Sequence, residues 1–203
     1  MGPRLVIENL EARLSEWLYL EYAAASRYWG GAIFTRVPPA MRPRLCGLGE
    51  VHACSFRELF GEEEVVILDP RAEEPLTRDD LLNAEAVVVG GILGYDRPRG
   101  RTAKHITRSL RHRARHLGRV QLSIDTAALV SRLIYLGERL ENIEVSCEVE
   151  VRLSEKERVL LPYGYVVYSG RVLLTPGLVE YLAGDEWLSC RQREAEPGAL
   201  AGP

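Results

Sequence analysis

The chain has 203 residues, a formal net charge of −3 and 46% hydrophobic residues, as expected for a globular protein with one large domain. The slightly negative charge argues against a general nucleic-acid coating protein. The longest uncharged apolar run, residues 86–93, is too short to cross a bilayer. The amino terminus has no signal-peptide pattern, so we expect a cytoplasmic protein without a membrane partner.

Strand and helix signals alternate along the first two thirds of the chain. Apolar runs predict strands over 4–8, 32–35, 65–68 and 86–89, and helices over 16–29, 56–60 and 77–84. Ser15 is the expected N-cap of the first helix. A basic helix over 103–115, a strand near Val120 and a helix from Asp125 to about Leu140 follow. This alternation predicts an α/β domain with a mostly parallel sheet flanked by helices.

The last third of the chain has a different pattern. Residues 143–151 alternate like an edge strand, and 165–169 with 171–174 predict a hairpin around Gly170. Pro176 is expected to open a last helix, and the chain from 191 on is expected to be disordered. We therefore expect a core over 1–142, a small extension of strand, hairpin and helix over 143–190, and a tail over 191–203.

A glycine-rich segment follows the most apolar strand. In 86–102, AVVVGGILGYDRPRGRT, the glycines Gly90, Gly91 and Gly94 leave backbone groups unshielded at a strand end, where open α/β sheets bind ligands. The spacing matches neither GxGxxG nor GxxxxGK[ST]. The apolar pair Ile92-Leu93 favours a flat, neutral group such as adenine. A tight turn without a ligand is the alternative.

Two further strand ends resemble ligand loops. They are Leu68-Asp69-Pro70 and the segment 117–127, which leads into a helix. Exposed N–H groups at these places suit a carboxylate or a polar ligand edge. Alternatively, Asp69 forms only a turn and Asp125 only an N-cap.

Glu21 lies within an apolar helical stripe, where a buried carboxylate is costly unless it is paired or used in function. A partner arginine in the core is the first explanation and a functional role is the second. Glu8 and Glu16 are expected to lie at the surface or in caps. The cysteines Cys46, Cys54, Cys147 and Cys190 show no CxxC spacing, and we expect no metal site.

Positive charge is concentrated between Arg97 and Arg119. This segment holds nine Lys or Arg residues and no acidic residue, with His105, His112 and His116 among them. Because like charges on one helix repel each other, the segment favours a surface for RNA, a ribonucleoprotein or another anion. Alternatively, its acidic partners lie elsewhere in the fold.

Five sequence blocks carry a family resemblance, in order from the amino terminus to about Leu182. They are IENLEARLSEWLYLEY (7–22), LDPRA (68–72), GGILGYDRPRGRT (90–102), LGRVQLSIDTA (117–127) and PYGY (162–165). The chain resembles the SPOUT-type S-adenosylmethionine-dependent methyltransferases. This family includes a fungal ribosomal-protein arginine methyltransferase and has also been labelled predicted RNA methyltransferase.

The resemblance implies a fold with a deep trefoil knot in the carboxyl-terminal part of the sheet, an exception to general topology. S-adenosylmethionine would be held mainly by backbone groups of three loops. The implied cofactor-binding residues are Leu68, Asp69, Pro70, Gly90, Gly91, Ile92 and Gly94, then Leu117, Gly118 and Gln121, then Leu122, Thr126 and Ala127 beside Asp125.

An arginine acceptor would need carboxylates, because its guanidinium is protonated in water. The candidates are Glu21, Asp96 and Asp125, with Arg101 as an organiser of the loop or of the cofactor carboxylate. The first expected function is protein arginine N-methylation of a ribosomal protein. The alternatives are an rRNA or tRNA methyltransferase with RNA contact through 97–119, and a non-catalytic binder of S-adenosylmethionine or ribonucleoprotein. A monomer and a homodimer through the knot are both open.

Overall fold

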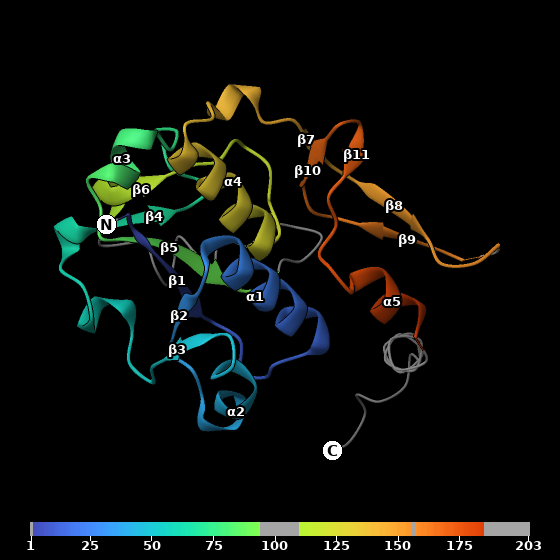
Figure 1. The fold of residues 1–203 in the computed structure, drawn as a ribbon, viewed down its shortest axis with the longest axis horizontal. Helices are drawn as coiled ribbons and strands as arrows, with labels where there is room; N and C mark the ends of the chain where they lie inside the picture. Colours follow the sequence, from blue (N-terminus) through green and yellow to red (C-terminus); the bar gives the residue numbers. More distant parts are fainter. Residues whose placement is uncertain (1, 94–109, 156, 185–203) are drawn as a thin grey trace, which may run out of the picture.

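A six-stranded parallel sheet forms the centre of the computed structural model, which describes residues 2–93, 110–155 and 157–184. The strand order is β3-β2-β1-β5-β4-β6, and every neighbouring pair is parallel (Figure 1). The expected α/β class with a mostly parallel sheet is therefore confirmed. The strands are β1 Arg4–Asn9, β2 Ala32–Thr35, β3 Gly49–Val51, β4 Val65–Leu68, β5 Ala86–Gly91 and β6 Ala114–Arg115.

Both faces of the sheet are buried, as is usual for parallel sheets. Helices α1 (Glu16–Trp29) and α4 (Ile124–Leu136) pack together over one face (Figure 1). Along β5, Val87 and Val89 join the core cluster under these helices, whereas Ala86 and Val88 join the cluster on the opposite face. This alternation follows from the period of two along a strand and places α1 beside α4.

Short helical segments complete the core domain. They are the α-helices α2 Arg42–Leu45 and α3 Arg78–Leu82, and the 3-10 turns Pro39–Met41, Phe56–Glu58, Glu62–Glu64, Arg111–Arg113 and Leu140–Asn142. In the described part of the chain, no helix has both the length and the apolar composition needed to cross a membrane.

The extension packs on the side of α1 (Figure 1). It contains a three-stranded antiparallel sheet, a two-stranded hairpin and the short helix α5. Trp17 of α1 meets Tyr163 edge to face, with ring centroids 6.3 Å apart, and Val166 is part of the main core. The elements are β7 Val145–Ser146, β8 Val149–Arg152, β9 Arg158–Leu161, β10 Tyr165–Tyr168, β11 Arg171–Val172 and α5 Leu178–Ala183.

Helix α4 differs from its expected bounds at both ends. Its N-cap is Ser123, whose side chain accepts from the N–H of Thr126, so Asp125 lies inside the first turn and is not the cap. The helix ends at Gly137, which has a left-handed φ of 112°, and does not continue to Leu140. Glycine takes this conformation without steric cost, which explains the early end.

Four other expectations for the second half also need correction. The described end of the predicted basic helix is a 3-10 turn followed by β6 at Ala114–Arg115, and this strand replaces the one expected near Val120. The strand expected over 143–151 divides into β7 and β8 of different sheets, with Glu148 at a φ of 57° between them. The last helix starts after Gly177, not at Pro176. Residues 94–109 and 191–203 lie outside the described parts, and the knot stays a prediction.

Candidate active site

Glu21 of α1 is buried against the start of α4. Its Oε1 accepts a hydrogen bond from Trp17 Nε1 at 2.7 Å, and its Oε2 accepts from the backbone N–H of Ile124 at 2.9 Å. The N–H groups in the first turn of a helix have no partner within the helix, so the carboxylate joins the two helices. The predicted burial of Glu21 is confirmed, with 1% of the residue exposed.

Asp125 is the second carboxylate of this site. It lies in the first turn of α4, is 2% exposed, and accepts from the Ser123 hydroxyl at 2.7 Å. The fold therefore buries two acidic side chains, Glu21 and Asp125, where the first turn of α4 packs on α1.

The environment raises the pKa of both carboxyl groups. Burial raises the pKa of Glu21 to about 8, and the charge of Asp125 adds to the rise; the N–H groups of Ile124 and Trp17 oppose it. Burial also raises the pKa of Asp125, against hydrogen bonds led by that from Ser123. Two interacting buried acids titrate as a pair. At pH 7 the Glu21 carboxyl, whose pKa is about 8, therefore keeps its proton.

No cationic side chain of the described residues forms an ion pair with Glu21 or Asp125. The core arginine considered as a partner of Glu21 is therefore not found in 2–93, 110–155 or 157–184. A buried charge without a partner is strongly unfavourable. The arrangement suits a positively charged group that binds from outside.

The extension supplies further polar groups near the pair. The hydroxyl groups of Tyr165 and Thr175 are buried, and the charges of both carboxylates contribute to a raised pKa of Tyr165, after burial itself. Tyr28 of α1 is half-buried and its pKa is also raised, first by burial and then by Asp125. We did not predict Tyr165, Thr175 or Tyr28 as site residues. Only PYGY (162–165), one of the resemblance blocks, pointed to this region.

The three predicted cofactor loops follow neighbouring strands. Strands β5, β4 and β6 are adjacent and parallel, so their carboxyl ends meet at one edge of the sheet, where ligands bind in open α/β folds. The described residues that we expected at these ends are Leu68, Asp69, Pro70, Gly90, Gly91, Ile92, Leu117, Gly118, Gln121, Leu122, Thr126 and Ala127. Gly94, Asp96 and Arg101 lie outside the described residues.

Direct contacts hold these loops together. Arg119 Nη1 donates to the Ala72 carbonyl at 3.3 Å, which joins the second loop to the first. The N–H of Gly164 donates to the Gln121 carbonyl at 2.9 Å, and Leu122 forms a parallel bridge with Gly164. The PYGY segment of the extension therefore packs directly on the loop that leads into α4.

Two of the predicted positions are constrained by close contacts within the fold. A Cβ atom at Gly91 would lie 2.2 Å from the Tyr22 hydroxyl, so this position must be glycine. Thr126 is buried, with its hydroxyl 2.7 Å from that of Ser123. These two residues can serve a ligand only through their backbone.

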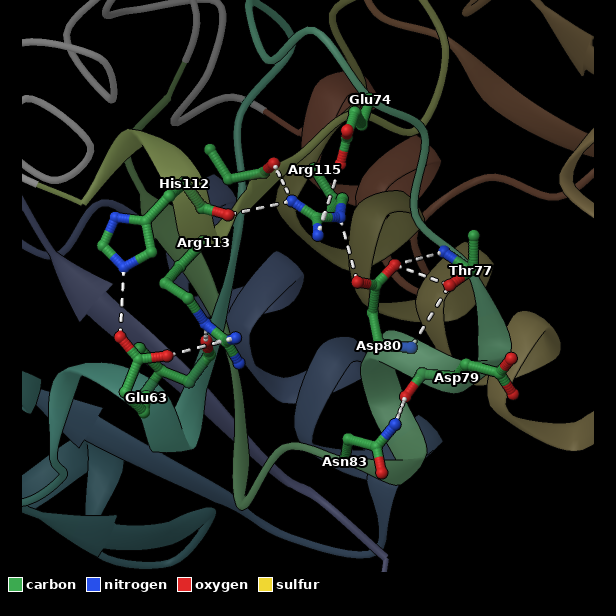
Figure 2. Close-up of polar contacts among 11 residues, drawn as sticks. Glu63, Glu74, Thr77, Asp79, Asp80, Asn83, His112, Arg113 and Arg115 are labelled. Atoms are coloured by element: carbon green, nitrogen blue, oxygen red, sulfur yellow. Dashed lines mark hydrogen bonds and ion pairs between the residues drawn. The ribbon is translucent and has the colours of Figure 1, made fainter.

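The described end of the basic segment is paired with acids from other parts of the fold (Figure 2). Arg115 contacts Asp80 at 3.0 Å and Glu74 at 3.4 Å. Arg113 and His112 contact Glu63 at 3.6 and 3.3 Å. Acidic partners elsewhere in the fold, one of our two interpretations, therefore account for these three residues.

Glu8 is buried, contrary to the prediction of a surface or capping residue. Its side chain accepts from the hydroxyls of Thr35 and Ser55 and from the N–H of Phe56. These contacts join β1 to β2 and to the following turn, so a structural role explains the burial. Glu16 is part of a surface ion pair with Arg44 at 2.7 Å, as expected. Among the described residues no group of three His, Cys, Asp or Glu could hold a metal ion.

Comparison with protein families gives a match over almost the whole fold. Residues 4–187 match the family described as protein arginine N-methyltransferase SFM1-like. The chain is 30% identical over 204 residues to protein arginine N-methyltransferase SFM1 of Saccharomyces cerevisiae, covering 90% of this chain and 95% of the relative.

Solved structures agree with this match. The yeast arginine methyltransferase SFM1 complexed with SAM has a TM-score of 0.80 and 29% identity, covering 90% of this chain and 91% of the other. Its complex with SAH gives 0.78 and 28%, covering 88% and 94%. Trm10 from Thermococcus kodakaraensis, at 0.53 and 18% identity over 69% and 96% of the two chains, shows the fold alone. The predicted SPOUT resemblance is confirmed, and the chain belongs to the SFM1-like protein arginine N-methyltransferase family.

Proposed function

We propose that this chain methylates the guanidinium group of an arginine in a ribosomal protein, with S-adenosylmethionine as methyl donor. The observation that carries the proposal is the buried pair Glu21 and Asp125, for which the described residues provide no cation. A guanidinium is planar, stays charged and carries five N–H donors. It is therefore the side chain best suited to two buried carboxylates.

The loops at the ends of β4, β5 and β6 fit the donor. Leu93, Leu117, Leu122 and Ala127 are half-buried apolar residues beside the core and suit the adenosyl part, while the backbone of 68–70 and 117–121 can serve its polar edges. When bound, S-adenosylmethionine supplies a methyl group already activated by a positively charged sulfur. The protein therefore has to position the acceptor and remove a proton from it.

Glu21 and Asp125 can do both. The positive charge of an entering guanidinium lowers the pKa of both carboxyls, so Glu21 loses its proton. The ionised pair then fixes the plane of the guanidinium. As the reacting nitrogen forms its new bond to the methyl carbon, the bond from this carbon to sulfur breaks and S-adenosylhomocysteine is the leaving group. One carboxylate accepts the proton that the nitrogen loses. Because an unbound guanidinium keeps its proton up to a pH above about 12, this proton transfer needs the pair close by.

The observations favour a protein acceptor over RNA. Arg113, Arg115 and His112 are paired with acids of the fold (Figure 2), and a buried acidic pair repels phosphate. The alternative, an RNA acceptor bound through residues 97–119, is one of the outcomes that the experiment below distinguishes. The ribosomal acceptor is suggested by the family resemblance, and such an acceptor would place the enzyme in the cytoplasm.

Transfer of a labelled methyl group tests the proposal. Ribosomes and total RNA from the source organism are incubated with the purified chain and methyl-labelled S-adenosylmethionine, then treated with protease or nuclease. We expect label that is lost only to protease and that is recovered as methylarginine after hydrolysis. Label lost to nuclease would show an RNA methyltransferase, and binding of the donor without any transfer would show a binding protein.

Replacing the carboxylates identifies their role. Glu21→Gln and Asp125→Asn should lower kcat by at least about 100-fold, the lower end of a general-base contribution, while the affinity for S-adenosylhomocysteine stays unchanged. Glu16→Gln, in the same helix but in a surface ion pair, is the matched control and should keep full activity. Loss of S-adenosylhomocysteine binding instead would assign the carboxylates to the donor site.

A further inference from the structure

Two buried hydroxyl groups in the extension have no hydrogen-bond partner among the described residues. They belong to Tyr165, with 0% of the residue exposed, and Thr175, with 2%. Native proteins contain few such groups, because each one has lost its water without gaining a new partner. Both hydroxyls are therefore free to pair with a polar group that binds from outside.

Tyr165 lies between the loop before α4 and the start of α1. It is the first residue of β10, and its neighbour Gly164 donates to the Gln121 carbonyl at 2.9 Å. These contacts place Tyr165 in the apolar cluster that packs on Trp17, the residue that donates to Glu21.

Thr175 reaches the pair from the other end of the extension. Its backbone carbonyl accepts from Leu178 at the start of α5. Two residues after Thr175, Gly177 packs so closely on Leu20 of α1 that a Cβ atom there would lie 3.1 Å from Leu20 Cδ2. This contact, with the packing of α5 on α1, holds the segment after Thr175 against the helix that carries Glu21.

Electrostatics agrees with this placement. Burial raises the pKa of Tyr165, and the charges of Glu21 and Asp125 raise it further, so the phenol stays protonated and neutral. The Thr175 hydroxyl is close enough to lower the pKa of Asp125, although its geometry falls short of a hydrogen bond. Both carboxylates thus have a neutral hydroxyl nearby.

We propose that the hydroxyls of Tyr165 and Thr175 bind the guanidinium of the acceptor arginine as neutral hydrogen-bond acceptors beside Glu21 and Asp125. This inference rests on the proposed arginine methylation. Each Glu21 oxygen already accepts one N–H of the protein, and Asp125 accepts from Ser123. The two hydroxyl oxygens therefore add acceptors for the five guanidinium N–H donors. A lysine ammonium has only three donors, so the two hydroxyls favour arginine over lysine.

The variants Tyr165→Phe and Thr175→Val test this assignment, with unmethylated ribosomes as acceptor. Each should raise the KM for the acceptor by roughly tenfold or more, the effect of losing one hydrogen bond to a charged group. The affinity for S-adenosylhomocysteine should not change. Thermal stability should stay the same or rise, because each substitution removes an unpaired buried hydroxyl. Tyr168→Phe, at the exposed end of the same strand, is the control and should match the wild type.

Other outcomes would overturn the inference. An unchanged KM in both variants would show that the hydroxyls do not bind the acceptor. A clear loss of thermal stability would show that they serve the fold. If the wild-type chain methylates no arginine, the proposed function fails first and this assignment fails with it; if it does methylate arginine, only the KM and stability of the variants decide.

Discussion

At the scale of single residues, the central feature is the buried carboxyl group of Glu21. Glu21 is held by one side-chain N–H and one backbone N–H while Asp125 lies beside it. The two hydrogen bonds fix its orientation but compensate only part of the cost of burial, which is why its pKa stays near 8. Because Glu21 keeps its proton until a cation binds, the free protein avoids the full free-energy cost of two buried negative charges.

The pH dependence of stability tests this state. Since the folded pKa of Glu21, about 8, lies above its ordinary 4.5, the folded protein binds this proton more tightly than the unfolded chain does. The free energy of unfolding should therefore fall as pH rises from about 4.5 to about 8. Glu21→Gln should reduce this pH dependence. Thermal denaturation can measure it, because a change of about 1 kcal/mol in the free energy of unfolding shifts the Tm by about 2–4 °C. Glu16→Gln should keep the wild-type slope; a wild-type slope in Glu21→Gln as well would refute the raised pKa.

At the scale of elements, the first turn of α4 combines a helix cap with a site residue. Ser123 accepts the Thr126 N–H as N-cap and donates its hydroxyl to Asp125, whereas Ser15 of α1 only caps. Ser123→Ala and Ser15→Ala should therefore each cost about 1 kcal/mol of stability. Only Ser123→Ala should also shift the acidic limb of the pH–rate profile to higher pH, because Asp125 loses a hydrogen bond that lowers its pKa. Equal profiles for the two variants would contradict this dual role.

Elements were predictable where local pattern decides them. The apolar runs of β1, β2, β4 and β5 and the cap of α1 were correctly predicted. The start of α4 was not, because Ser123 and Asp125 are both good N-caps and stand two residues apart. Strand β6 has only two residues, and its pairing with β4 gives no local signal. Glu8 was misplaced because its partners come from 27 to 48 residues away.

The residues of the candidate site were also predictable only where local sequence carries a signal. Glu21 and Asp125 could be predicted from the apolar stripe and the family resemblance. Tyr165 and Thr175 could not, because only tertiary packing brings β10 and the start of α5 to α1.

At the scale of the whole molecule, the extension and the core share one packed interior and, in the proposed function, one site. Val166 belongs to the main core, Trp17 contacts Tyr163, and Gly164 is bonded to the loop before α4. The expected division at residue 142 remains a boundary in sequence, but these contacts couple the two parts. The carboxylates come from the core and the two hydroxyls from the extension, so neither part alone holds the whole proposed site.

This coupling predicts a single cooperative unfolding transition. In urea, the far-ultraviolet circular dichroism and the tryptophan fluorescence of the double variant Trp29→Phe/Trp187→Phe should have the same midpoint. Trp17 is the one tryptophan left in this variant, and it reports on the contact with the extension. An earlier midpoint for the fluorescence would show that the extension unfolds separately and would contradict a shared site.

The proton balance of acceptor binding tests the central claim most directly. Calorimetry in buffers of different ionisation enthalpy would measure the protons released when the unmethylated acceptor binds the S-adenosylhomocysteine-loaded chain at pH 7. The buried pair predicts release approaching one proton for the wild type and clearly less for Glu21→Gln. Equal release by the two proteins, or none by the wild type, would contradict the binding of a guanidinium between Glu21 and Asp125.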